Sequence, residues 1–553
     1  MTGSDHDSPA TVHELFDRAV NARPGHRALV DESTYARGRA LTYTELQAES
    51  RRVAAGLHQA GLRRGDAIAF LLPSCAEWVA TFLAAARLGL LVVPLNTRYR
   101  GPELRHLLTV SRAKALVVAP EFESVGLAAR LGEAWQHIDE LAIHTLVPVH
   151  AGTVPGAPAR LDQLPYTQLA AGPSALPADA GAGAPDDPMI VFGTSGTTSA
   201  PKLAVHTQRT VSTHVPAAAA AAGLAPEDVA LSVLPLNGTF GFVPFTAGLA
   251  SGVTQVLLPV YDSDRVLSAL AAHGVTFMTC AEGPLRDLLA DPRLAATTPA
   301  LRRVVTAGVA IDDIVRAART AGITATNVYG SSEIFAFAAT WHPGESDEQR
   351  AVPGGRPVGP GLQVRVADLD TGAPVEPGVE GELQFTGPTL FTGYLANPEA
   401  TARAHTADGW YRTGDRGSLL PEDGFHYLSR LGDAMRIKGY LVNPADVEAG
   451  LAEHPAVAIA QLVGVRDQHT GDDHPIAFVT LRSGATATGE ELRQHCREAL
   501  AGFKVPDRVE ILDRFPTTPS ANGDKIRKDR LRETAAHLLA GTDTPTTARP
   551  TEN

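Results

Sequence analysis

Cysteine and lysine are scarce in this chain of 553 residues, and both shortages limit what it can be. The three cysteines, Cys75, Cys280 and Cys496, lie far apart and show no paired spacing. This pattern argues against a disulfide framework and against a zinc site. Only six of the 48 basic residues are lysine, so each lysine is worth inspecting as a compact positive charge.

A basic surface, a long apolar run and a secretory leader are also missing. The formal net charge is −13, which argues against nucleic acid as a partner. No apolar run reaches the roughly 18 residues of a membrane span. Residues 1–10 are polar and acidic, unlike a signal peptide. We therefore expect a cytoplasmic protein with no membrane span.

Length and apolar content indicate a large core and more than one domain, since domains average ~150 residues. The hydrophobic content of 44% is ordinary for a globular protein. Helical patterns alternate with strand-like runs at residues 67–72, 91–94, 115–118, 254–258 and 303–305. This rhythm predicts βαβ units and largely parallel, buried sheets, so the expected fold class is α/β.

The pattern changes near residue 360, where short strand-like runs are split by Gly/Pro turns. We predict a β subdomain at about 355–430, which completes an N-terminal domain of residues 11–430. A further alternation of strands and helices predicts a C-terminal domain of residues 431–535. Residues 1–10 and the Thr/Pro-rich end, residues 536–553, are predicted to be disordered.

The most informative stretch is 193–202, Gly-Thr-Ser-Gly-Thr-Thr-Ser-Ala-Pro-Lys, which follows the apolar run 189–192. It offers backbone N–H groups, hydroxyls and the Lys202 ammonium to a polyphosphate. The spacing of a Walker-type phosphate loop is absent. Taken alone, the stretch is equally compatible with a flexible surface linker.

Four later motifs place reactive residues behind strands or on glycine turns. Glu333 follows Tyr329-Gly330 and could hold Mg²⁺ beside phosphate oxygens. Asp415 is set by a glycine turn and suits a bidentate bond to ribose hydroxyls. Arg430 and a glycine-containing loop that ends in Lys525 complete the set. Each has an ordinary alternative: a solvated Glu, a turn Asp or a solvated basic stretch.

Together and in this order, the five motifs resemble the adenylate-forming superfamily of acyl-CoA synthetases, amino-acid adenylation domains and luciferases. The resemblance covers roughly residues 12–535. It implies a large N-terminal domain of two α/β sheets plus a β subdomain, then a small, mobile α+β domain that swings about a hinge near Arg430. It also implies ATP, Mg²⁺ and CoA as cofactors, and a carboxylic acid or its acyl-AMP as partner.

The resemblance assigns roles to individual positions. It implies that Lys525 bridges the acid and the α-phosphate, Ser332 contacts the α-phosphate and Glu333 holds Mg²⁺. The implied ATP/AMP-binding positions are Thr194, Ser195, Gly196, Thr197, Thr198, Lys202, Gly308, Val309, Ala310, Asn327, Val328, Tyr329, Gly330, Ser332, Asp415, Tyr427 and Arg430. The remaining positions are Asn237, Gly238 and Phe240 for the acyl pocket, Lys438, Gly439 and Tyr440 for CoA, and Gly432 for the hinge.

Three positions depart from the family's usual pattern. Ser199 stands where the phosphate loop usually has Gly, and a β-carbon at a positive-φ position costs roughly 1 kcal/mol. Gly432 replaces the usual Asp or Lys of the hinge. Asn237-Gly238 replaces an aromatic residue and a His, which should widen the acyl pocket toward bulky hydrophobic acids.

We therefore predict an AMP-forming acid–thiol ligase that makes an acyl-CoA from a bulky hydrophobic acid through an acyl-AMP. Ser199 leaves open a non-adenylating ligase, fed with acyl-AMP by a separate adenylating partner enzyme, as suits natural product biosynthesis in actinomycetes. A carrier-protein-loading ligase and a non-catalytic acyl-AMP-binding pseudoenzyme also remain open. An amino-acid adenylation domain is less favoured, because residues 236–240 lack an Asp for the substrate amine.

Overall fold

The computed structural model describes residues 11–540 apart from gaps at 34–37, 124, 177–179, 195–200, 298–299, 309–310, 422, 432–434, 439, 443, 468–471 and 519–524. Two compact units result, the first ending at Leu431 and the second beginning at Gly432. The predicted α/β class, with a larger N-terminal and a smaller C-terminal domain, is confirmed. None of the helices in the described part combines the length and apolarity needed to cross a bilayer.

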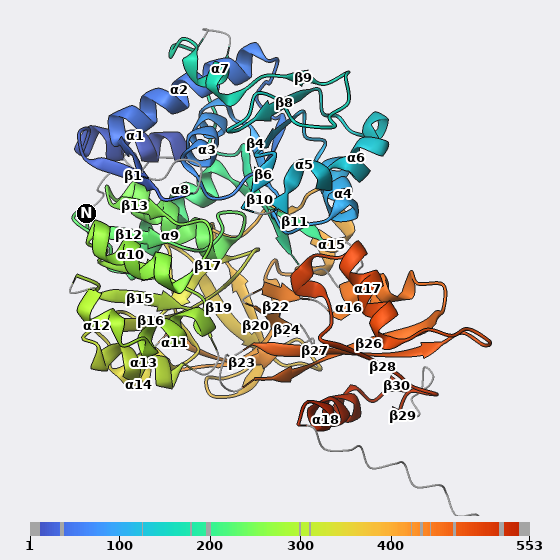
Figure 1. The fold of residues 1–553 in the computed structure, drawn as a ribbon. Helices are drawn as coiled ribbons and strands as arrows, with labels where there is room; N and C mark the ends of the chain where they lie inside the picture. The colour runs from blue at the N-terminus through green and yellow to red at the C-terminus, as the bar shows by residue number, and fades with distance from the viewer. Residues whose placement is uncertain are drawn as a thin grey trace, which may run out of the picture. The chain divides into compact units, whose positions relative to one another are not determined.

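The first unit contains an eight-stranded sheet whose apolar middle strands run parallel (Figure 1). Its order is β21 (Gly393–Tyr394), β11 (Lys202–Thr207), β10 (Pro188–Thr194), β4 (Leu91–Pro94), β3 (Ala67–Leu71), β5 (Ala115–Val118), β8 (Thr145–Pro148) and β9 (Asp162–Gln163). β3, β4 and β5 are wholly buried, as their continuous apolar runs predict. β10 and β11 instead form an antiparallel pair.

Helices and a small hairpin accompany this sheet along the chain. They are α1 (Val12–Ala22), α2 (Tyr43–Gln59), α3 (Ala76–Leu88), α4 (Gly101–Ser111), β6 (Glu121–Phe122), β7 (Val125–Gly126), α5 (Leu127–Arg130), α6 (Gly132–Gln136) and α7 (Tyr166–Ala171). Thr11 and Thr42 are the N-caps of α1 and α2, and both form capping boxes. Each threonine side chain accepts a hydrogen bond from the backbone N–H of Glu14 or Glu45, and the carboxylate of that glutamate accepts one from the backbone N–H of the threonine. These local signals explain why α1 begins at Val12 and α2 at Tyr43.

A second, thirteen-stranded sheet changes from parallel to antiparallel along its width. Its parallel part contains β1 (Arg27–Asp31), β12 (Val229–Ser232), β13 (Thr254–Leu257), β14 (Phe277–Thr279), β15 (Arg303–Thr306) and β16 (Thr324–Ser331), with β2 (Arg39–Thr42) antiparallel at its edge. The antiparallel part contains β17 (Phe335–Thr340), β18 (Gly354–Pro357), β19 (Gln363–Ala367), β20 (Glu380–Thr386), β22 (Tyr411–Leu419) and β23 (Phe425–Arg430). The β-rich region of residues 355–430 therefore continues this sheet.

Helices accompany the second sheet and join it to the first. They are α8 (Gln208–Ala221), α9 (Thr239–Ala250), α10 (Ser263–His273), α11 (Glu282–Ala290), α12 (Arg293–Thr297), α13 (Asp312–Thr320), α14 (Asp347–Ala351) and α15 (Pro398–Arg403). One apolar core includes residues of both sheets together with α3, α8 and α9 (Figure 1). Phe242 of α9 lies at its centre, with its ring centroid 5.2 Å from Phe82 and 5.3 Å from Phe192.

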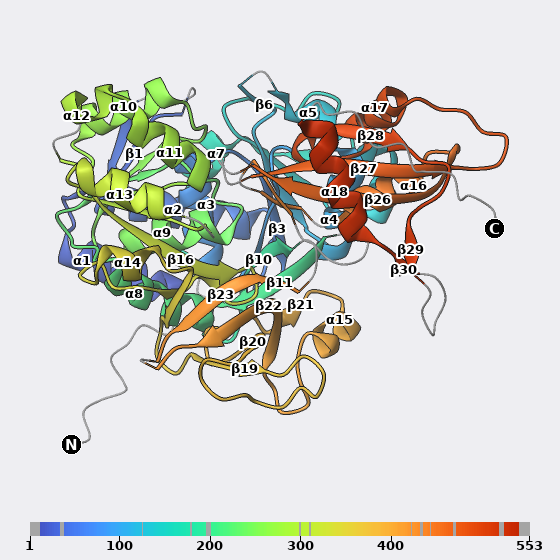
Figure 2. The same cartoon turned by 90° about the horizontal axis from the view of Figure 1, so that it is seen from below.

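The second unit is a three-stranded sheet, β26-β27-β28, covered by helices (Figure 2). Its elements are β24 (Met435–Ile437), β25 (Tyr440–Val442), α16 (Pro444–Ala452), β26 (Val457–Arg466), β27 (Asp473–Leu481), α17 (Gly489–Ala499), β28 (Arg508–Ile511), β29 (Thr517–Thr518), β30 (Lys525–Ile526) and α18 (Lys528–Leu539). α16 and α18 contact β26, and α17 contacts β28. A buried ion pair joins Lys504 Nζ to Asp446 Oδ2 at 3.2 Å.

The predicted start of the disordered tail at residue 536 is wrong, because α18 continues to Leu539. Leu531 and Ala535 of this helix are buried in a cluster with Phe478, and Leu538 packs against the same cluster. This apolar stripe stabilises the last turn. Residues 541–553 lie outside the described residues, as do residues 1–10.

The position of Phe242 predicts that truncation of its ring will destabilise the first unit. Phe242→Ala should lower the free energy of unfolding by about 3–5 kcal/mol, because it removes ring contacts and leaves a cavity. Urea unfolding followed by tryptophan fluorescence measures this loss, since Trp78 lies 6.5 Å from Phe242. Leu369→Ala is the control, because that side chain is 54% exposed. Equal losses in both variants would contradict the inferred role of the core.

Candidate active site

The Gly/Ser/Thr stretch begins and ends on a pair of neighbouring strands. β10 and β11 place Thr194 directly opposite Lys202, and Gly193 opposite Leu203. The predicted phosphate-loop residues Ser195, Gly196, Thr197 and Thr198, and the unusual Ser199, lie outside the described residues. The structure therefore fixes the base of this loop and the lysine that follows it.

The turn that carries Ser332 and Glu333 lies against that base. It joins β16 to β17 in an antiparallel hairpin, with an irregular register between Tyr329 and Ser331. Ser332 Oγ donates a hydrogen bond to the Gly193 carbonyl at 3.3 Å. The Ser332 carbonyl accepts a bond of 2.8 Å from His206 Nε2 in β11. Strands of both sheets thus meet at this turn.

Glu333 and Lys202 share a partner, Tyr394 of β21. Tyr394 Oη donates to Glu333 Oε1 at 2.8 Å, and Lys202 Nζ lies 4.4 Å from the centroid of the same ring. Burial lowers the pKa of the Lys202 ammonium, while the negative charge of Glu333 opposes that shift. A buried carboxylate and a half-buried ammonium are therefore held side by side by one tyrosine.

Tyr329, four residues before Glu333, links the hairpin to Asp415. Its Oη donates to Asp415 Oδ2 at 2.6 Å, and both residues are buried. The sequence suggested a turn around Asp415, but the residue lies inside β22, where it pairs with Arg430 of β23. Gly414, at φ +70°, supplies the local bend within the strand. Tyr427 lies 5.7 Å from the Tyr329 ring.

Gly308 and Asn327 form a second small pair, after β15 and within β16. Gly308 N–H donates to Asn327 Oδ1 at 3.1 Å, and Asn327 Nδ2 donates back to the Gly308 carbonyl at 2.9 Å. Val328 is buried beside Asn327, and Val309 and Ala310 lie outside the described residues. Gly330 leaves no room for a side chain, because a β-carbon there would lie 2.1 Å from the Phe335 carbonyl oxygen.

The predicted acyl-pocket residues lie at the start of α9. Asn237 Nδ2 donates to the Leu95 carbonyl at 3.4 Å, and Gly238 is the N-cap of the helix. A β-carbon built on Gly238 would meet no described atom within 4 Å, so the glycine borders open space. Phe240 is half-buried against the main core, and α9 contacts β17 directly after the Glu333 turn.

The remaining predicted residues belong to the second unit. Lys438 is exposed at φ +50°, and Tyr440 stacks on Phe503 with ring centroids 4.2 Å apart. Lys525 lies in β30, where its backbone pairs with Thr518. Gly432 and Gly439 lie outside the described residues.

Sequence reasoning missed three residues that shape this site: Tyr394, His206 and Phe335. Tyr394 is joined to Glu333 only because β21 pairs with β11, far away in sequence. Phe335, at φ +64°, is stacked between His206 and His214, with centroid distances of 3.7 and 5.0 Å. No periodic signal marks these residues, and the one local hint is the glycine, Gly393, directly before Tyr394.

Comparison with known proteins shows the family of the chain. The chain matches the AMP-binding enzyme family over residues 16–395 and its C-terminal domain over residues 446–522. It is 31% identical to an indoleacetate–CoA ligase from Aromatoleum aromaticum, over 95% of this chain and 98% of the relative. It is 32% identical to a 3-[(3aS,4S,7aS)-7a-methyl-1,5-dioxo-octahydro-1H-inden-4-yl]propanoyl:CoA ligase from Mycobacterium tuberculosis, again over 95% and 98%. The solved amide bond synthetase from Marinactinospora thermotolerans has a TM-score of 0.81 and 29% identity, over 94% of this chain and 99% of that one.

The chain therefore belongs to the AMP-binding enzyme family, which confirms the predicted membership of the adenylate-forming superfamily. Its class is that of the AMP-forming acid–thiol ligases, as predicted. An acid, ATP and CoA are the substrates of this class.

The histidine stack behind the Ser332 turn predicts a specific loss of stability in acid. Burial lowers the pKa of His206 to about 3 and of His214 to about 4, against 6.5 for an exposed histidine. The unfolded chain binds more protons below pH 6.5, so the stability conferred by both neutral rings is present above pH 6.5. It is lost as the pH falls from 6.5 toward 4, by about 1.4 kcal/mol per pH unit for each ring.

Urea unfolding at several pH values between 6.5 and 4 tests this loss. The double variant His206→Gln/His214→Gln should be less stable than the wild type at pH 6.5, but its stability should fall less steeply toward pH 4. His137→Gln, at a partly exposed position of the same unit, should keep the wild-type slope. Parallel curves for the wild type and the double variant would contradict the assignment.

Proposed function

We propose that this protein joins a bulky hydrophobic carboxylic acid to CoA in two steps, through an acyl-AMP. The observation that carries the proposal is the contact of Glu333 and Lys202 with one tyrosine, at the base of a hydroxyl-rich loop. Tyr329 extends the same hairpin to the buried carboxylate of Asp415. These groups match, in kind and order, what a nucleotide with a phosphate chain requires.

In the first step the chain binds ATP and orients the acid. Lys202 and the hydroxyls of 194–198 would neutralise and hold the phosphates, and Ser332 would contact the α-phosphate. Glu333 would hold Mg²⁺, which supplies charge neutralisation to the phosphates when bound. Asp415 and Arg430 would hold the ribose, while Gly308–Ala310, Asn327, Val328, Tyr329 and Tyr427 would surround the nucleoside. A carboxylate oxygen of the acid attacks the α-phosphorus, and pyrophosphate leaves.

In the second step the thioester forms at the acyl carbon. The sulfur of CoA attacks that carbon, the bond to AMP breaks, and the thiol proton passes to solvent. Lys525 would serve the first step, by bridging the acid and the α-phosphate. Lys438, Gly439 and Tyr440 would serve the second, after the C-terminal domain has rotated about Gly432. Most of the rate gain in such chemistry comes from positioning and charge neutralisation.

Two observations support a bulky acid. Gly238 borders open space at the start of α9, so none of the described side chains would narrow that side of an acyl pocket there. The relatives named above are ligases of an indole acid and of a fused-ring propanoic acid, both larger than acetate. An open glycine position admits ring systems that an aromatic side chain would exclude.

We propose CoA as the acceptor of the acyl group. The ligases with 31–32% identity use CoA by name, whereas the similar solved structure is an amide bond synthetase. A panel of CoA, a phosphopantetheinyl carrier protein and a primary amine, each offered with the acyl-AMP, separates these acceptors. We expect CoA to give the highest kcat/KM.

Removal of Lys525 should separate the two steps. Lys525→Ala should lower acid-dependent pyrophosphate release by ~10²–10³-fold, because one positioned cation of the transition state is lost. Conversion of synthetic acyl-AMP and CoA should stay within a few-fold of the wild type. Lys528→Ala is the control, since that neighbouring ammonium pairs with Glu448 at 3.1 Å. If Lys525→Ala lowered the rates of both steps equally, the role assigned to Lys525 would be wrong.

A second candidate function rests on Ser199, which replaces the glycine usual in the phosphate loop. If the wild type released no pyrophosphate with any acid but converted acyl-AMP to acyl-CoA, it would be a thioester-only ligase. Ser199→Gly should then restore pyrophosphate release. Vigorous release by the wild type would exclude this candidate.

The open space at Gly238 predicts a size-dependent effect of substitution. Gly238→Phe should lower kcat/KM for a fused-ring acid at least tenfold more than for acetate or propanoate, because the new ring occupies the space of the larger acid. Gly152→Phe, on an exposed turn of the same unit, is the matched control. Equal losses for large and small acids would show that Gly238 does not border the acyl pocket.

A further inference from the structure

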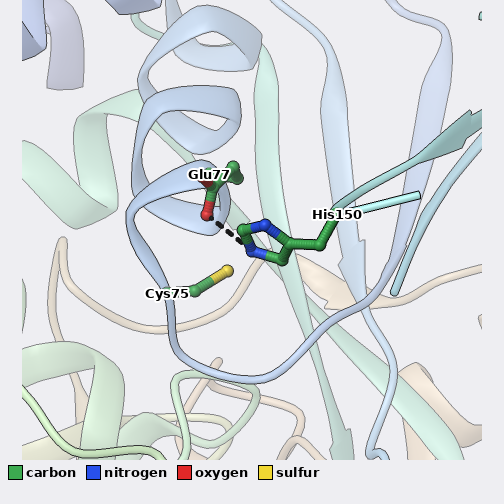
Figure 3. Close-up of side chains that lie close together, drawn as sticks. All are labelled: Cys75, Glu77 and His150. Carbon is green, nitrogen blue, oxygen red and sulfur yellow. Dashed lines mark ion pairs between the residues drawn. The ribbon is translucent and has the colours of Figure 1, made fainter. Parts of the chain in front are cut away.

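Three side chains of kinds that ligate metal ions converge on one point of the first unit (Figure 3). Cys75 is the N-cap residue of α3, Glu77 lies in the first turn of that helix, and His150 follows β8. One sulfur, one carboxylate oxygen and one imidazole nitrogen all lie within 4.8 Å of one another. None of the three residues is assigned to ATP, the acid or CoA.

Arg39 fixes the orientation of the Glu77 carboxylate. Its Oε1 accepts a hydrogen bond of 2.7 Å from Arg39 Nη1, which leaves Oε2 to face His150 Nε2 at 3.3 Å. Cys75 and Glu77 are buried, whereas the His150 side chain is 21% exposed. Two of the three side chains are therefore buried, and the third, that of His150, reaches solvent.

The surroundings of the cluster are rich in carboxylates. Arg39 also pairs with Glu49 at 2.6 Å, and Tyr166 Oη donates to Glu49 at 2.7 Å. Asp31, fully buried, accepts a 2.7 Å bond from the Ala76 N–H beside Cys75. Among the described residues, Glu49 and Glu77 thus share the guanidinium of Arg39, and Asp31 adds a third carboxyl group beside Cys75. A bound cation would balance this charge.

We propose that Cys75, Glu77 and His150 form a binding site for a thiophilic divalent cation, with Zn²⁺ as the best fit. Sulfur, nitrogen and carboxylate oxygen are the ligands that Zn²⁺ takes, and three protein ligands leave a fourth, tetrahedral position for water. Tetrahedral bonds of about 2.0–2.3 Å place ligand atoms roughly 3.5 Å apart. The present separations therefore need only small side-chain movements.

Binding of a metal ion at this site would require the Cys75 thiol to lose its proton, and it would stabilise the fold. Burial and the charges of Glu77 and Asp31 raise the pKa of the Cys75 thiol, so the thiol must release its proton to solvent as the sulfur–metal bond forms. The metal would also replace the ion pair between Glu77 and His150. In return, it would tie the turn after β8 to the start of α3, and so stabilise the folded chain by mass action.

Cobalt titration of the full, metal-free chain tests the site directly. A thiolate bound to Co²⁺ gives a near-ultraviolet charge-transfer band, and we expect this band to saturate at one Co²⁺ per chain. Zn²⁺ should abolish the band by displacement. Cys75→Ser should remove it, whereas Cys280→Ser and Cys496→Ser, at the other two buried cysteines, should keep it. Absence of the band in the wild type, or its persistence in Cys75→Ser, would overturn the proposal.

A second variant keeps the test decisive if Cys75→Ser fails to fold. His150→Ala lies on the open side of the cluster and should weaken Co²⁺ binding by more than about 10-fold, because loss of even a residue that only supports a ligand costs about 10–100-fold in metal affinity. Zn²⁺ should raise the thermal unfolding midpoint of the wild type but not that of His150→Ala. His137→Ala, at a partly exposed histidine of the same unit outside the cluster, should behave as the wild type. Equal Co²⁺ affinity in His150→Ala and His137→Ala would also overturn the site.

Discussion

The bonds that hold the Ser332 turn against the base of the phosphate loop are the constraint on which the site depends. Ser332 belongs to the turn after β16 of one sheet, whereas His206 and Gly193 belong to β11 and β10 of the other. Tyr394, also in the sheet of β11, reaches Glu333 in the same way. The site is therefore built across two sheets. The helices between them, packed around Phe242, set the spacing at which these bonds form.

Backbone strain is concentrated at the same place. Phe335 and Phe337 follow Glu333 with φ values of +64° and +61°, a conformation that bulky residues rarely adopt. Such residues cost of order 1–3 kcal/mol each and persist only where the surroundings enforce them. Here the enforcing contacts are His206 and His214, which enclose the Phe335 ring and bond to the Ser332 and Ala336 carbonyls. Both histidines must be neutral to stay buried. Protonation of either ring, which requires a pH far below neutral, would therefore disturb the geometry of the turn.

Much of this architecture can be predicted from sequence, for local reasons. Parallel strands such as Ala115–Val118 are continuous apolar runs, and Thr-x-x-Glu caps fix where α1 and α2 begin. Glu333 and Lys202 stand out because glycine and hydroxyl residues surround them. Tyr394 could not be found in this way, since its role exists only through the pairing of β21 with β11. Asp415 was expected on a turn because Gly414 precedes it, but cross-strand pairing with Arg430 keeps the residue inside β22.

Charge balance distinguishes the two polar clusters of the first unit and indicates what each can bind. Around Glu333, the Lys202 ammonium matches the negative charge of the carboxylate, so the proposed polyphosphate would bring its own Mg²⁺. Around Glu77, the carboxylates outnumber the described guanidinium of Arg39, because Glu49 and Glu77 share it and Asp31 lies buried beside Cys75. There an added anion would be repelled and an added cation retained. Sequence spacing could not reveal this second cluster, because His150 is 73 positions beyond Glu77 and meets it only through the parallel order of β3, β5 and β8.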